Sequence, residues 1–402
     1  MKPTKLAPCL IIGLLAATQV SAQIVTKNGA TPTEGVQTIV LEEQWRVGGE
    51  DDDIFFGTVS GAVSADNGNL YVLDGQLSQI QAYSPDGEWL MTLSGEGDGP
   101  GEVRNPGGIF VDRAGELCML NGMRGQIVRV NPDNTPAEVL QYTNEAGGGM
   151  TIMLGGTVAG DGFMLAGINI IFGQGGGSGQ KYFLTQCDAQ GAAQHTILEK
   201  MHPIDYSDFV LDELSMDFAW NRWTVDADGR MYVAPDRNDY RIEVYSPQGE
   251  LEHVISREYE SFPRDEELKR LATLVIEGVG AYHPVPLKGV TIEEFEPDIM
   301  SMWMTPEGEL WVHTSRGINE APAGAYALYD VFSPEGEFVR QVAVECEADA
   351  KKDSLAMLDD GRIVVVTGIL DAWLSQQSVE RSEEEKDAAD ANPLEVVIYA
   401  LK

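Results

Sequence analysis

The sequence predicts an all-β protein: a six-bladed β-propeller of four-stranded antiparallel blades, closed by an N-terminal strand joining the C-terminal blade, with one helical insertion between blades 4 and 5. Three observations predict this fold. A strand–turn–strand phrase recurs six times, a second turn phrase follows it, and the last copy lacks a strand that the N-terminus can supply. At 402 residues the chain exceeds one average domain, but closed β-rings are larger than the usual domain.

The first phrase is an apolar strand, a turn with Asp and Gly, and a second apolar strand. Clear copies are "VSADNGNLYVLD" from Val63, "VDADGRMYVAP" from Val225 and "MTPEGELWVHT" from Met304. The six turn glycines are Gly68, Gly115, Gly162, Gly229, Gly308 and Gly361. The first three are spaced by 47 residues, and the later gaps of 67, 79 and 53 are typical of a repeat that has received insertions.

A second turn phrase follows each copy except the last and adds two more strands. It is clearest in "YSPDGEWL" from Tyr83, "YSPQGELE" from Tyr245 and "FSPEGEFV" from Phe332. Pro presets φ at the second position of such a turn, and Gly accepts a positive φ later in it. Each unit therefore contains four antiparallel strands, which make one propeller blade.

The sixth copy is incomplete, because the chain stops at Lys402 before a fourth strand. The stretch "VQTIVLEEQWRV", Val36 to Val47, precedes the first copy and belongs to no blade of its own. We expect it to pair with the C-terminal strand, because closure of the ring covers a row of unpaired backbone groups. The resulting organisation is an N-terminal linker at 23–35 and a single propeller domain at 36–402.

The stretch "GEGDGPGEVRNPGG", Gly95 to Gly108, is either a phosphate-binding loop or a joint between two blades. A phosphate loop leads into a helix N-terminus and ends with a Lys. Here the glycines lead into the apolar run Ile109-Phe110-Val111, and no Lys follows. We therefore interpret the stretch as the joint between the outer strand of blade 1 and the inner strand of blade 2.

The first 22 residues predict a secretory signal peptide. Lys2 and Lys5 precede an apolar stretch of nine residues, Cys9 to Ala17, and Val20-Ser21-Ala22 ends in small residues. We therefore expect export, either to the periplasm or out of the cell.

The charge composition of the chain argues against some classes of binding partner. The formal net charge is −37 and the pI about 4.3, so the surface repels nucleic acid and anionic lipid. No segment beyond the signal peptide is long and apolar enough to cross a membrane. We also expect the protein to be a monomer. The remaining cysteines, Cys118, Cys187 and Cys346, are an odd number, which predicts buried free thiols and leaves one disulfide pair open.

The stretch at about 258–297 predicts the helical insertion. Pro263 to Glu277 has helical periodicity, and Gly278 is expected to end the helix. Its apolar face is Leu268, Leu271, Ala272 and Val275. The helix either packs on the side of the propeller or forms a lid over one mouth of its channel, with Tyr282 and His283 nearby. Long insertions in compact folds are often functional, so both interpretations are kept.

Two stretches resemble known propellers. "GEGDGPGEVRNPGGIFVDRAGELCML" resembles the NHL-type repeat, with its Gly-Pro-Gly-Glu linker and Gly-x-Leu turn exit. "DIMSMWMTPEGELWV", followed by "YALYDVFSPEGEFVRQV", resembles the fifth blade of secreted bacterial six-bladed propellers of the TolB-like superfamily. The resemblance covers nearly all of the mature chain and implies the fold. Most members of this group are binding or uncharacterised exported proteins, which says little about function.

The same resemblance includes some enzymes, namely calcium-dependent lactonases and a zinc-dependent peptide-amidating lyase. This sequence lacks the Glu-Gly-Pro that opens the first blade in the gluconolactonase group. It also lacks a set of histidines at equivalent blade positions, as found in the lyase. None of its five histidines has a metal-ligand spacing, and no catalytic serine motif is present, so no catalytic residue is assigned.

Residues just before each inner strand of a propeller face one mouth of its channel. The candidates for binding there are Arg104, Asn105, Trp220, Asn221, Arg222, Asp298, Lys351, Lys352 and Asp353. Four of these carry side-chain oxygens suited to Ca²⁺, which prefers six to eight oxygen ligands: Asn105, Asn221, Asp298 and Asp353. Gly107, Leu154 and Met300 at equivalent positions interrupt a ring of ligands. The alternative is therefore polar loop residues that cap strands.

These observations favour an exported binding module that holds a protein, peptide or glycan through its channel mouth and loops. One alternative is a channel-sited, metal-assisted hydrolase or lyase of lactonase type. Another is a structural module of an envelope assembly. Metal content after purification distinguishes the enzyme from the binding module, and stable co-purification with a larger partner is expected only of the envelope module.

Overall fold

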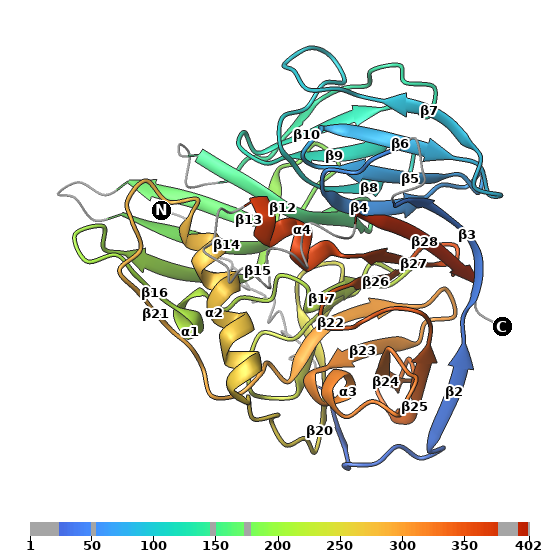
Figure 1. Ribbon diagram of the computed structural model, residues 1–402, viewed down its shortest axis with the longest axis vertical. Coiled ribbons are helices and arrows are strands. Elements are labelled where there is room, and N and C mark those ends of the chain that lie inside the picture. Colours follow the sequence, from blue (N-terminus) through green and yellow to red (C-terminus); the bar gives the residue numbers. More distant parts are fainter. Residues whose placement is uncertain (1–23, 50–53, 145–149, 173–177, 377–392, 401–402) are drawn as a thin grey trace, which may run out of the picture.

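The computed structural model describes residues 24–49, 54–144, 150–172, 178–376 and 393–400, which form a six-bladed β-propeller (Figure 1). Each blade contains four antiparallel strands, the sheets of blades 4 and 5 carry a fifth strand at their outer edge, and the inner strands of several neighbouring blades contact one another. The predicted fold class is confirmed. The expected signal peptide at 1–22 lies outside the described residues. Within the described part of the chain, no helix has the length and apolar character needed to span a membrane.

Blades 1 to 3 each use four strands that are consecutive in the chain. Blade 1 contains β4 (Val59–Ser64), β5 (Leu70–Asp74), β6 (Gln79–Tyr83) and β7 (Trp89–Leu93). Blade 2 contains β8 (Pro106–Val111), β9 (Leu117–Asn121), β10 (Gln126–Val130) and β11 (Leu140–Gln141). Blade 3 contains β12 (Met150–Ala159), β13 (Gly162–Phe172), β14 (Ser178–Cys187) and β15 (Ala193–Ile204).

Blades 4 to 6 each take one additional strand from the N-terminus. Blade 4 is built from β17 (Trp223–Val225), β18 (Met231–Val233), β19 (Arg241–Tyr245) and β20 (Leu251–Arg257). Blade 5 is built from β22 (Ile299–Met304), β23 (Leu310–Thr314), β24 (Ala327–Phe332) and β25 (Phe338–Glu345). Blade 6 has β26 (Ser354–Met357), β27 (Ile363–Thr367) and β28 (Glu395–Ala400) as its first three strands.

The remaining elements lie outside the blades. A small parallel pair, β16 (Val210–Asp212) and β21 (Gly289–Thr291), joins the segment after blade 3 to the insertion between blades 4 and 5. The helices are α1 (Glu213–Met216), α2 (Glu266–Gly280), α3 (Ser315–Asn319) and α4 (Ile369–Gln376). The predicted helical insertion between blades 4 and 5 is therefore present, and α2 is its main element.

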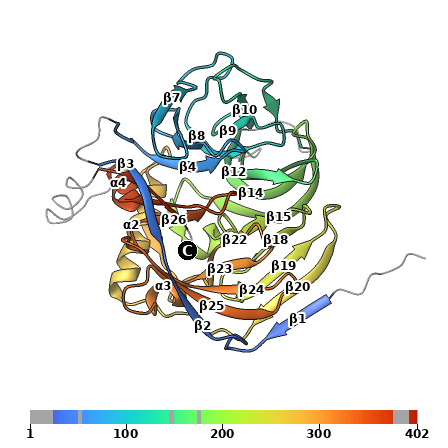
Figure 2. The same cartoon turned by 90° about the vertical axis from the view of Figure 1, so that its right-hand side faces the viewer.

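The N-terminal residues form an arm of three strands along the outside of blades 4, 5 and 6 (Figure 2). β1 (Ile24–Asn28) pairs in parallel with β20, and β2 (Val36–Val40) pairs in parallel with β25. β3 (Glu42–Gly48) pairs antiparallel with β28 and becomes the fourth strand of blade 6. The arm covers three sheet edges that would otherwise present unpaired backbone groups.

The expectation for Val36–Val47 is correct in part. Its second half closes the ring through β3, as predicted. The expectation that the whole stretch joins the C-terminal strand is wrong, because its first half lies on blade 5 as β2. The chain passes from blade 5 to blade 6 at Leu41, which is buried between them. The expected linker at 23–35 likewise contains a strand, β1, because the outer edge of blade 4 offers it backbone partners.

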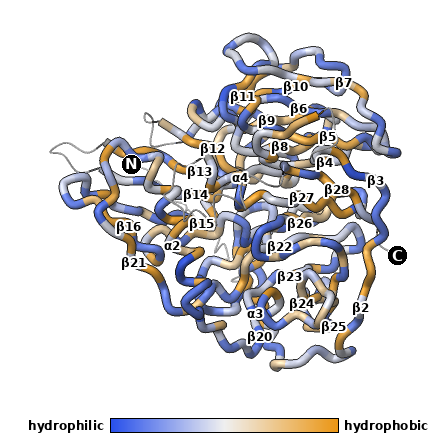
Figure 3. Tube along the Cα trace, in the orientation of Figure 1, coloured by the Kyte–Doolittle hydropathy of each residue, from blue (hydrophilic) through white to orange (hydrophobic). Residues whose placement is uncertain are grey.

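The core lies between the blades. Among the described residues, six apolar clusters each join two neighbouring blades, and a seventh joins the segment after blade 3 to the insertion. In β5, Leu70 and Val72 pack toward blade 6, whereas Tyr71 and Leu73 pack toward blade 2. Successive side chains of a strand point to opposite faces, so a strand buried on both faces is almost continuously apolar. Figure 3 shows this character along β5 and β28.

The repeat turns explain the spacing of the glycines. Gly68 and Gly361 have φ of +77° and +83°, and each N–H closes the turn on the carbonyl three residues earlier. Blade 3 differs from the prediction. Gly162 begins β13, and Gly160 takes the positive φ, because pairing up to Ala159 leaves only a two-residue loop.

The glycine-rich joint connects β7 to β8, as predicted. The Glu102 carboxylate accepts a hydrogen bond from the Gly99 N–H at 2.8 Å, and a side chain at Gly97 would collide with it. Arg104 forms ion pairs with Glu96 and Asp98 in the same loop. The loop therefore satisfies its own amide and guanidinium groups. The cysteines are also as expected in being free, with Cys118 and Cys187 buried and Cys346 partly buried.

A buried ion pair links blade 4 to blade 5. Nη2 of Arg257, at the end of β20, lies 2.7 Å from Oδ2 of Asp330 in β24, and Asp330 is fully buried. The guanidinium carbon also lies 4.8–4.9 Å from the ring centres of Tyr240, Tyr259 and Phe338. Burial raises the pKa of Asp330, although Arg257 opposes this effect.

We predict that Arg257→Met lowers the free energy of unfolding by about 3–5 kcal/mol, because it leaves the Asp330 carboxylate buried without its cation. The matched control is Arg113→Met, which breaks an exposed pair with Asp161 and should cost less than about 1 kcal/mol. Equilibrium denaturation in urea measures both variants. Equal losses of unfolding free energy in the two variants would show that the ion pair of Arg257 with Asp330 does not stabilise the contact between blades 4 and 5.

Candidate functional site

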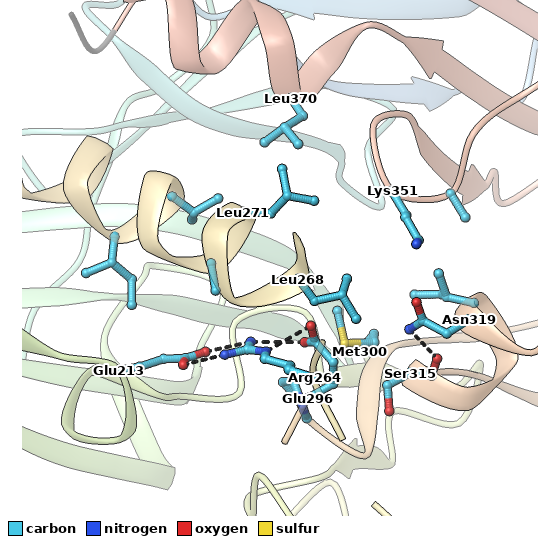
Figure 4. A pocket seen from close by; sticks show the side chains of 16 residues that line it. Glu213, Arg264, Leu268, Leu271, Glu296, Met300, Ser315, Asn319, Lys351 and Leu370 are labelled. Carbon is cyan, nitrogen blue, oxygen red and sulfur yellow. Dashed lines mark hydrogen bonds and ion pairs between the residues drawn. The ribbon is translucent and has the colours of Figure 1, made fainter. Parts of the chain in front are cut away.

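An apolar cavity of about 330 Å³ lies beside α2, at the end of the propeller where β22 begins (Figure 4). Its walls come from the insertion, from α3 and α4, and from the loop that precedes β26. The lining residues are Glu213, Arg264, Leu268, Leu271, Ala272, Val275, Ile276, Glu296, Pro297, Met300, Ser315, Ile318, Asn319, Ala350, Lys351 and Leu370. Ten of these sixteen residues are apolar, and the polar ones are Glu213, Arg264, Glu296, Ser315, Asn319 and Lys351. Its volume is at the small end of the range for ligand pockets.

Helix α2 provides the apolar wall. Its N-cap is Asp265, whose carboxylate accepts a hydrogen bond from the Leu268 N–H at 2.9 Å. Glu266 and Glu267 in the first turn suit the positive end of the helix dipole. The predicted apolar face, Leu268, Leu271, Ala272 and Val275, lines the cavity. Ile276, on the same side of the helix, also lines the cavity and packs in the cluster that joins the insertion to the segment after blade 3.

The predicted bounds of this helix are wrong at both ends. It begins at Glu266 rather than Pro263, because Asp265 is the residue that caps it. It continues through Gly278 to Gly280, because Gly278 keeps helical backbone and both glycines are buried. A side chain at Gly280 would lie 2.9 Å from Leu287, so this end of the helix packs closely against the returning chain.

Ion pairs of low exposure run from one end of the cavity into blade 4. Three arginines and three carboxylates alternate, with nitrogen–oxygen distances between 2.6 and 3.4 Å at successive links. We call this set the ion-pair chain; in order it is Arg222, Asp217, Arg237, Glu213, Arg264 and Glu296. The ion-pair chain ties the insertion to α1 and to the start of β17, so it fixes the position of α2.

Glu213 is the central carboxylate of the ion-pair chain. It accepts hydrogen bonds from both terminal nitrogens of Arg264, at 2.6 and 2.8 Å, and from the Glu293 N–H at 2.8 Å. Burial by itself would raise the pKa of Glu213, but these hydrogen bonds and the charges of Arg264 and Arg237 hold it below the ordinary value of 4.5. Glu213 is therefore an anion at neutral pH.

The structure brings some of the predicted mouth residues to this cavity. Lys351 lines it, and Asp298 follows the lining residue Pro297. Asp298 is buried, its backbone N–H donates to the Arg237 carbonyl at 2.8 Å, and burial raises the pKa of its carboxyl. Arg222 belongs to the ion-pair chain and does not line the cavity.

The other candidates contact other parts of the protein or lie outside the lining. Trp220 packs on Tyr182 and Phe218, and the Asn221 carbonyl accepts from the Met302 N–H. Asp353 accepts from the N–H groups of Asp349 and Gly368. Arg104 and Asn105 lie in the joint before blade 2, and Lys352 is exposed beside the cavity without lining it.

The lid candidates lie beyond the C-terminal end of α2. His283 Nδ1 is 3.2 Å from the Tyr206 hydroxyl, and the His283 ring lies 4.7 Å from that of Phe209. Burial lowers the pKa of His283. Tyr282 is 69% exposed. Neither residue lines the cavity, which α2 covers with the side chains of its apolar face instead.

In the part of the chain that the structure describes, no three or more His, Cys, Asp or Glu side chains lie close enough together to hold a metal ion. The carboxylates of the calcium candidates Asp298 and Asp353 therefore belong to no such group, and Asn105 and Asn221 lie in different blades.

Sequence reasoning missed most of the ion-pair chain. Glu213, Arg264 and Glu296 come from three separate segments, and Glu213 is 51 residues from Arg264. No motif or spacing connects them. The one available signal was an unusual density of charge at both ends of an otherwise apolar insertion.

No family model matches the chain, and no curated protein is similar to it in sequence. Several solved structures share its architecture at low identity. A Bacteroides fragilis protein thought to be exported has 10% identity and a TM-score of 0.46, covering 94% of this chain and 99% of that chain. A luciferin-regenerating enzyme has 13% identity and a TM-score of 0.42, covering 87% and 94% of the two chains. Regucalcin from Agrobacterium tumefaciens, a calcium-binding protein, has 8% identity and a TM-score of 0.43, covering 90% and 95%.

The fold and the site together define a class: a six-bladed β-propeller with a helical insertion over an apolar cavity. At these identities and TM-scores, the similarities to solved structures carry no assignment of activity.

We predict that acid loosens the insertion. The pKa of Glu213 is lower in the folded state, so its contribution to stability is present above pH 4.5 and is lost as the pH falls through the lower folded value. Arg264→Gln removes one of the two cations that lower this pKa. Hydrogen exchange of α2, corrected for intrinsic rates, should therefore be faster than in the wild type already at pH 7, with a smaller further increase on acidification.

The control for this experiment is Arg230→Gln, which removes an exposed arginine from a turn of blade 4. Its exchange profile in α2 should match that of the wild type. An Arg264→Gln profile equal to the control at every pH would show that the ion-pair chain does not hold the helix.

Proposed function

We propose that the protein is an exported binding propeller, of the NHL-like and TolB-like kind that its sequence resembles, and that the cavity beside α2 holds its ligand. The supporting observation is an aliphatic lining around a preformed space at the end of the propeller where inner strands begin. Pockets of this composition, with a few polar groups at the margin, are the usual form of small-molecule sites.

The lining favours some ligand classes over others. A glycan would bury hydroxyl groups against Leu271, Val275 and Leu370, which cannot hydrogen-bond to them, and this burial is costly. A ligand with an aliphatic part, such as an apolar peptide side chain or an alkyl chain, gains free energy from the same contact. The proposal is therefore a binding site for an aliphatic group.

The rigidity of the site supports this function. The ion-pair chain fixes the N-terminal end of α2 on the propeller, and the Ser315 N–H donates to the Asp298 carbonyl, which places α3. A cavity held open in this way binds without a large ordering cost.

A neutral fluorescent probe tests the proposal. N-phenyl-1-naphthylamine should bind the wild type saturably at one site. Leu271→Asp should weaken that binding by about tenfold or more, because a charge replaces a leucine side chain whose burial contributes about 1.5–3 kcal/mol. Leu271 is only partly buried, so the variant should fold, and circular dichroism checks this.

The control is the same substitution at an exposed leucine of blade 1, Leu90→Asp. This variant should bind the probe as the wild type does. Probe binding that is unaffected by Leu271→Asp, or lost equally in both variants, would move the site away from the cavity.

Asp298 favours a second candidate function, metal-assisted hydrolysis or lyase chemistry. Its buried Oδ1 has no hydrogen-bond partner among the described residues, and it lies next to the cavity lining. Elemental analysis of dialysed protein decides between the two functions. The binding function predicts no stoichiometric calcium or zinc and unchanged probe binding in Asp298→Asn. A bound metal that this substitution removes would support the enzyme.

A further inference from the structure

The two ends of the cavity differ in charge. Figure 4 shows Glu213 and Lys351 on opposite sides of the cavity, with Arg264 held between the carboxylates of Glu213 and Glu296. Arg264 donates Nη1 and Nη2 to Glu213 and Nη2 also to Glu296 at 3.0 Å, so its terminal donors point at protein carboxylates rather than at a ligand.

The end formed by the ion-pair chain carries no net charge. Its three guanidinium groups are matched by three carboxylates, and each member has at least one partner within 3.4 Å. A ligand that approached this end would have to compete with ion pairs that are already formed and desolvated. A charged ligand group therefore gains no binding free energy at this end of the cavity.

The opposite end of the cavity is lined by a cation, Lys351. Lys351 lies in the loop between β25 and β26, and within the described residues its amino group has no ion-pair partner. Two acids of the same loop accept backbone N–H groups, Asp349 that of Lys351 itself at 2.9 Å and Asp353 that of Asp349 at 2.7 Å, and neither forms an ion pair with the Lys351 amino group. Figure 4 shows the Lys351 amino nitrogen directed toward the space between α2 and α3.

We propose that the cavity selects aliphatic carboxylates, and this inference rests on the proposed function. The alkyl part lies against Leu268, Leu271 and Leu370, and the carboxylate forms an ion pair with Lys351. This arrangement buries the apolar part of the ligand and leaves its charge at the solvated margin, so neither group pays a desolvation cost that its contacts do not offset.

Two sources could supply such a group, a free alkanoate or the C-terminus of an apolar peptide. Both present a carboxylate next to an aliphatic body. Two matched ligand pairs separate charge from source: decanoate with decan-1-ol, and N-acetyl-Leu-Leu with its C-terminal amide. Within each pair the aliphatic body is kept and only the charged end differs.

Displacement of N-phenyl-1-naphthylamine measures the affinity of each ligand. The wild type should prefer the charged member of at least one pair by about fivefold at low salt, the ratio expected for one partly exposed ion pair. The preference should fall as salt is raised, because salt screens exposed charges. The pair with the stronger preference identifies the source.

Lys351→Met should abolish the preference while keeping affinity for the uncharged members. The matched control is Lys352→Met, which removes a lysine from the next position in the chain, outside the lining, and should retain the wild-type ratio. A ratio near one in the wild type, or a ratio unchanged by Lys351→Met, would overturn the inference and leave the binding function intact. No displacement by any of the four ligands, together with no saturable binding of the probe, would instead contradict the proposed function itself.

Discussion

The structure depends on closure of the ring by the pairing of β3 with β28. Every blade is buried on both faces, so each needs a neighbour on each side. Blade 6 has only three strands of its own, and β3 supplies the fourth, bringing Val47 opposite Val396 across most of the chain length. Without this pairing the apolar surface between blades 6 and 1 would be poorly covered and the edge of blade 6 would be open. The arm that carries β3 also covers blades 4 and 5, so one segment secures half of the ring.

The candidate site follows from this rigidity. The blades themselves pack against each other and leave their loops and insertions at the two ends. At one end, the insertion between blades 4 and 5 folds back and is fixed by the ion-pair chain, which places an apolar helix face over the starts of the inner strands. Buried ion pairs contribute little net stability, but their geometry is demanding. Here they determine where α2 lies, and the position of α2 determines the size and the aliphatic character of the cavity.

The division of charge at the cavity has the same origin. Arg264 and Arg237 are neutralised because they hold the insertion in place, whereas Lys351 belongs to a loop of blade 6 and has no such role. A single cation at the margin of an aliphatic cavity is a simple basis for selecting an amphipathic anion in a protein whose formal charge is −37. The strongly acidic surface acts against anions in general, so recognition of one depends on local contact rather than on long-range attraction.

Much of the fold was predictable because it is repetitive. A turn glycine at the same place in five of the six units, an apolar run on either side of it and, in several units, a proline turn after it are local requirements, and local requirements appear in local sequence. The apolar face of α2 was predictable for the same reason, since its period is that of a helix. The split of Val36–Val47 between two blades was not predictable, because both halves are equally suited to a sheet edge.

The amino-acid sequence by itself determined the number of blades, the four strands in each, and which side chains of α2 are apolar. Only the tertiary structure decided that β1 and β2 add to the outer edges of blades 4 and 5, and that Glu213, Arg264 and Glu296 meet beside one cavity. The physical reason is the range of the interactions. Turns and periodic faces are set by neighbours in the chain, whereas ion pairs and edge pairings join residues that are tens to hundreds of positions apart and become close only when the ring has formed.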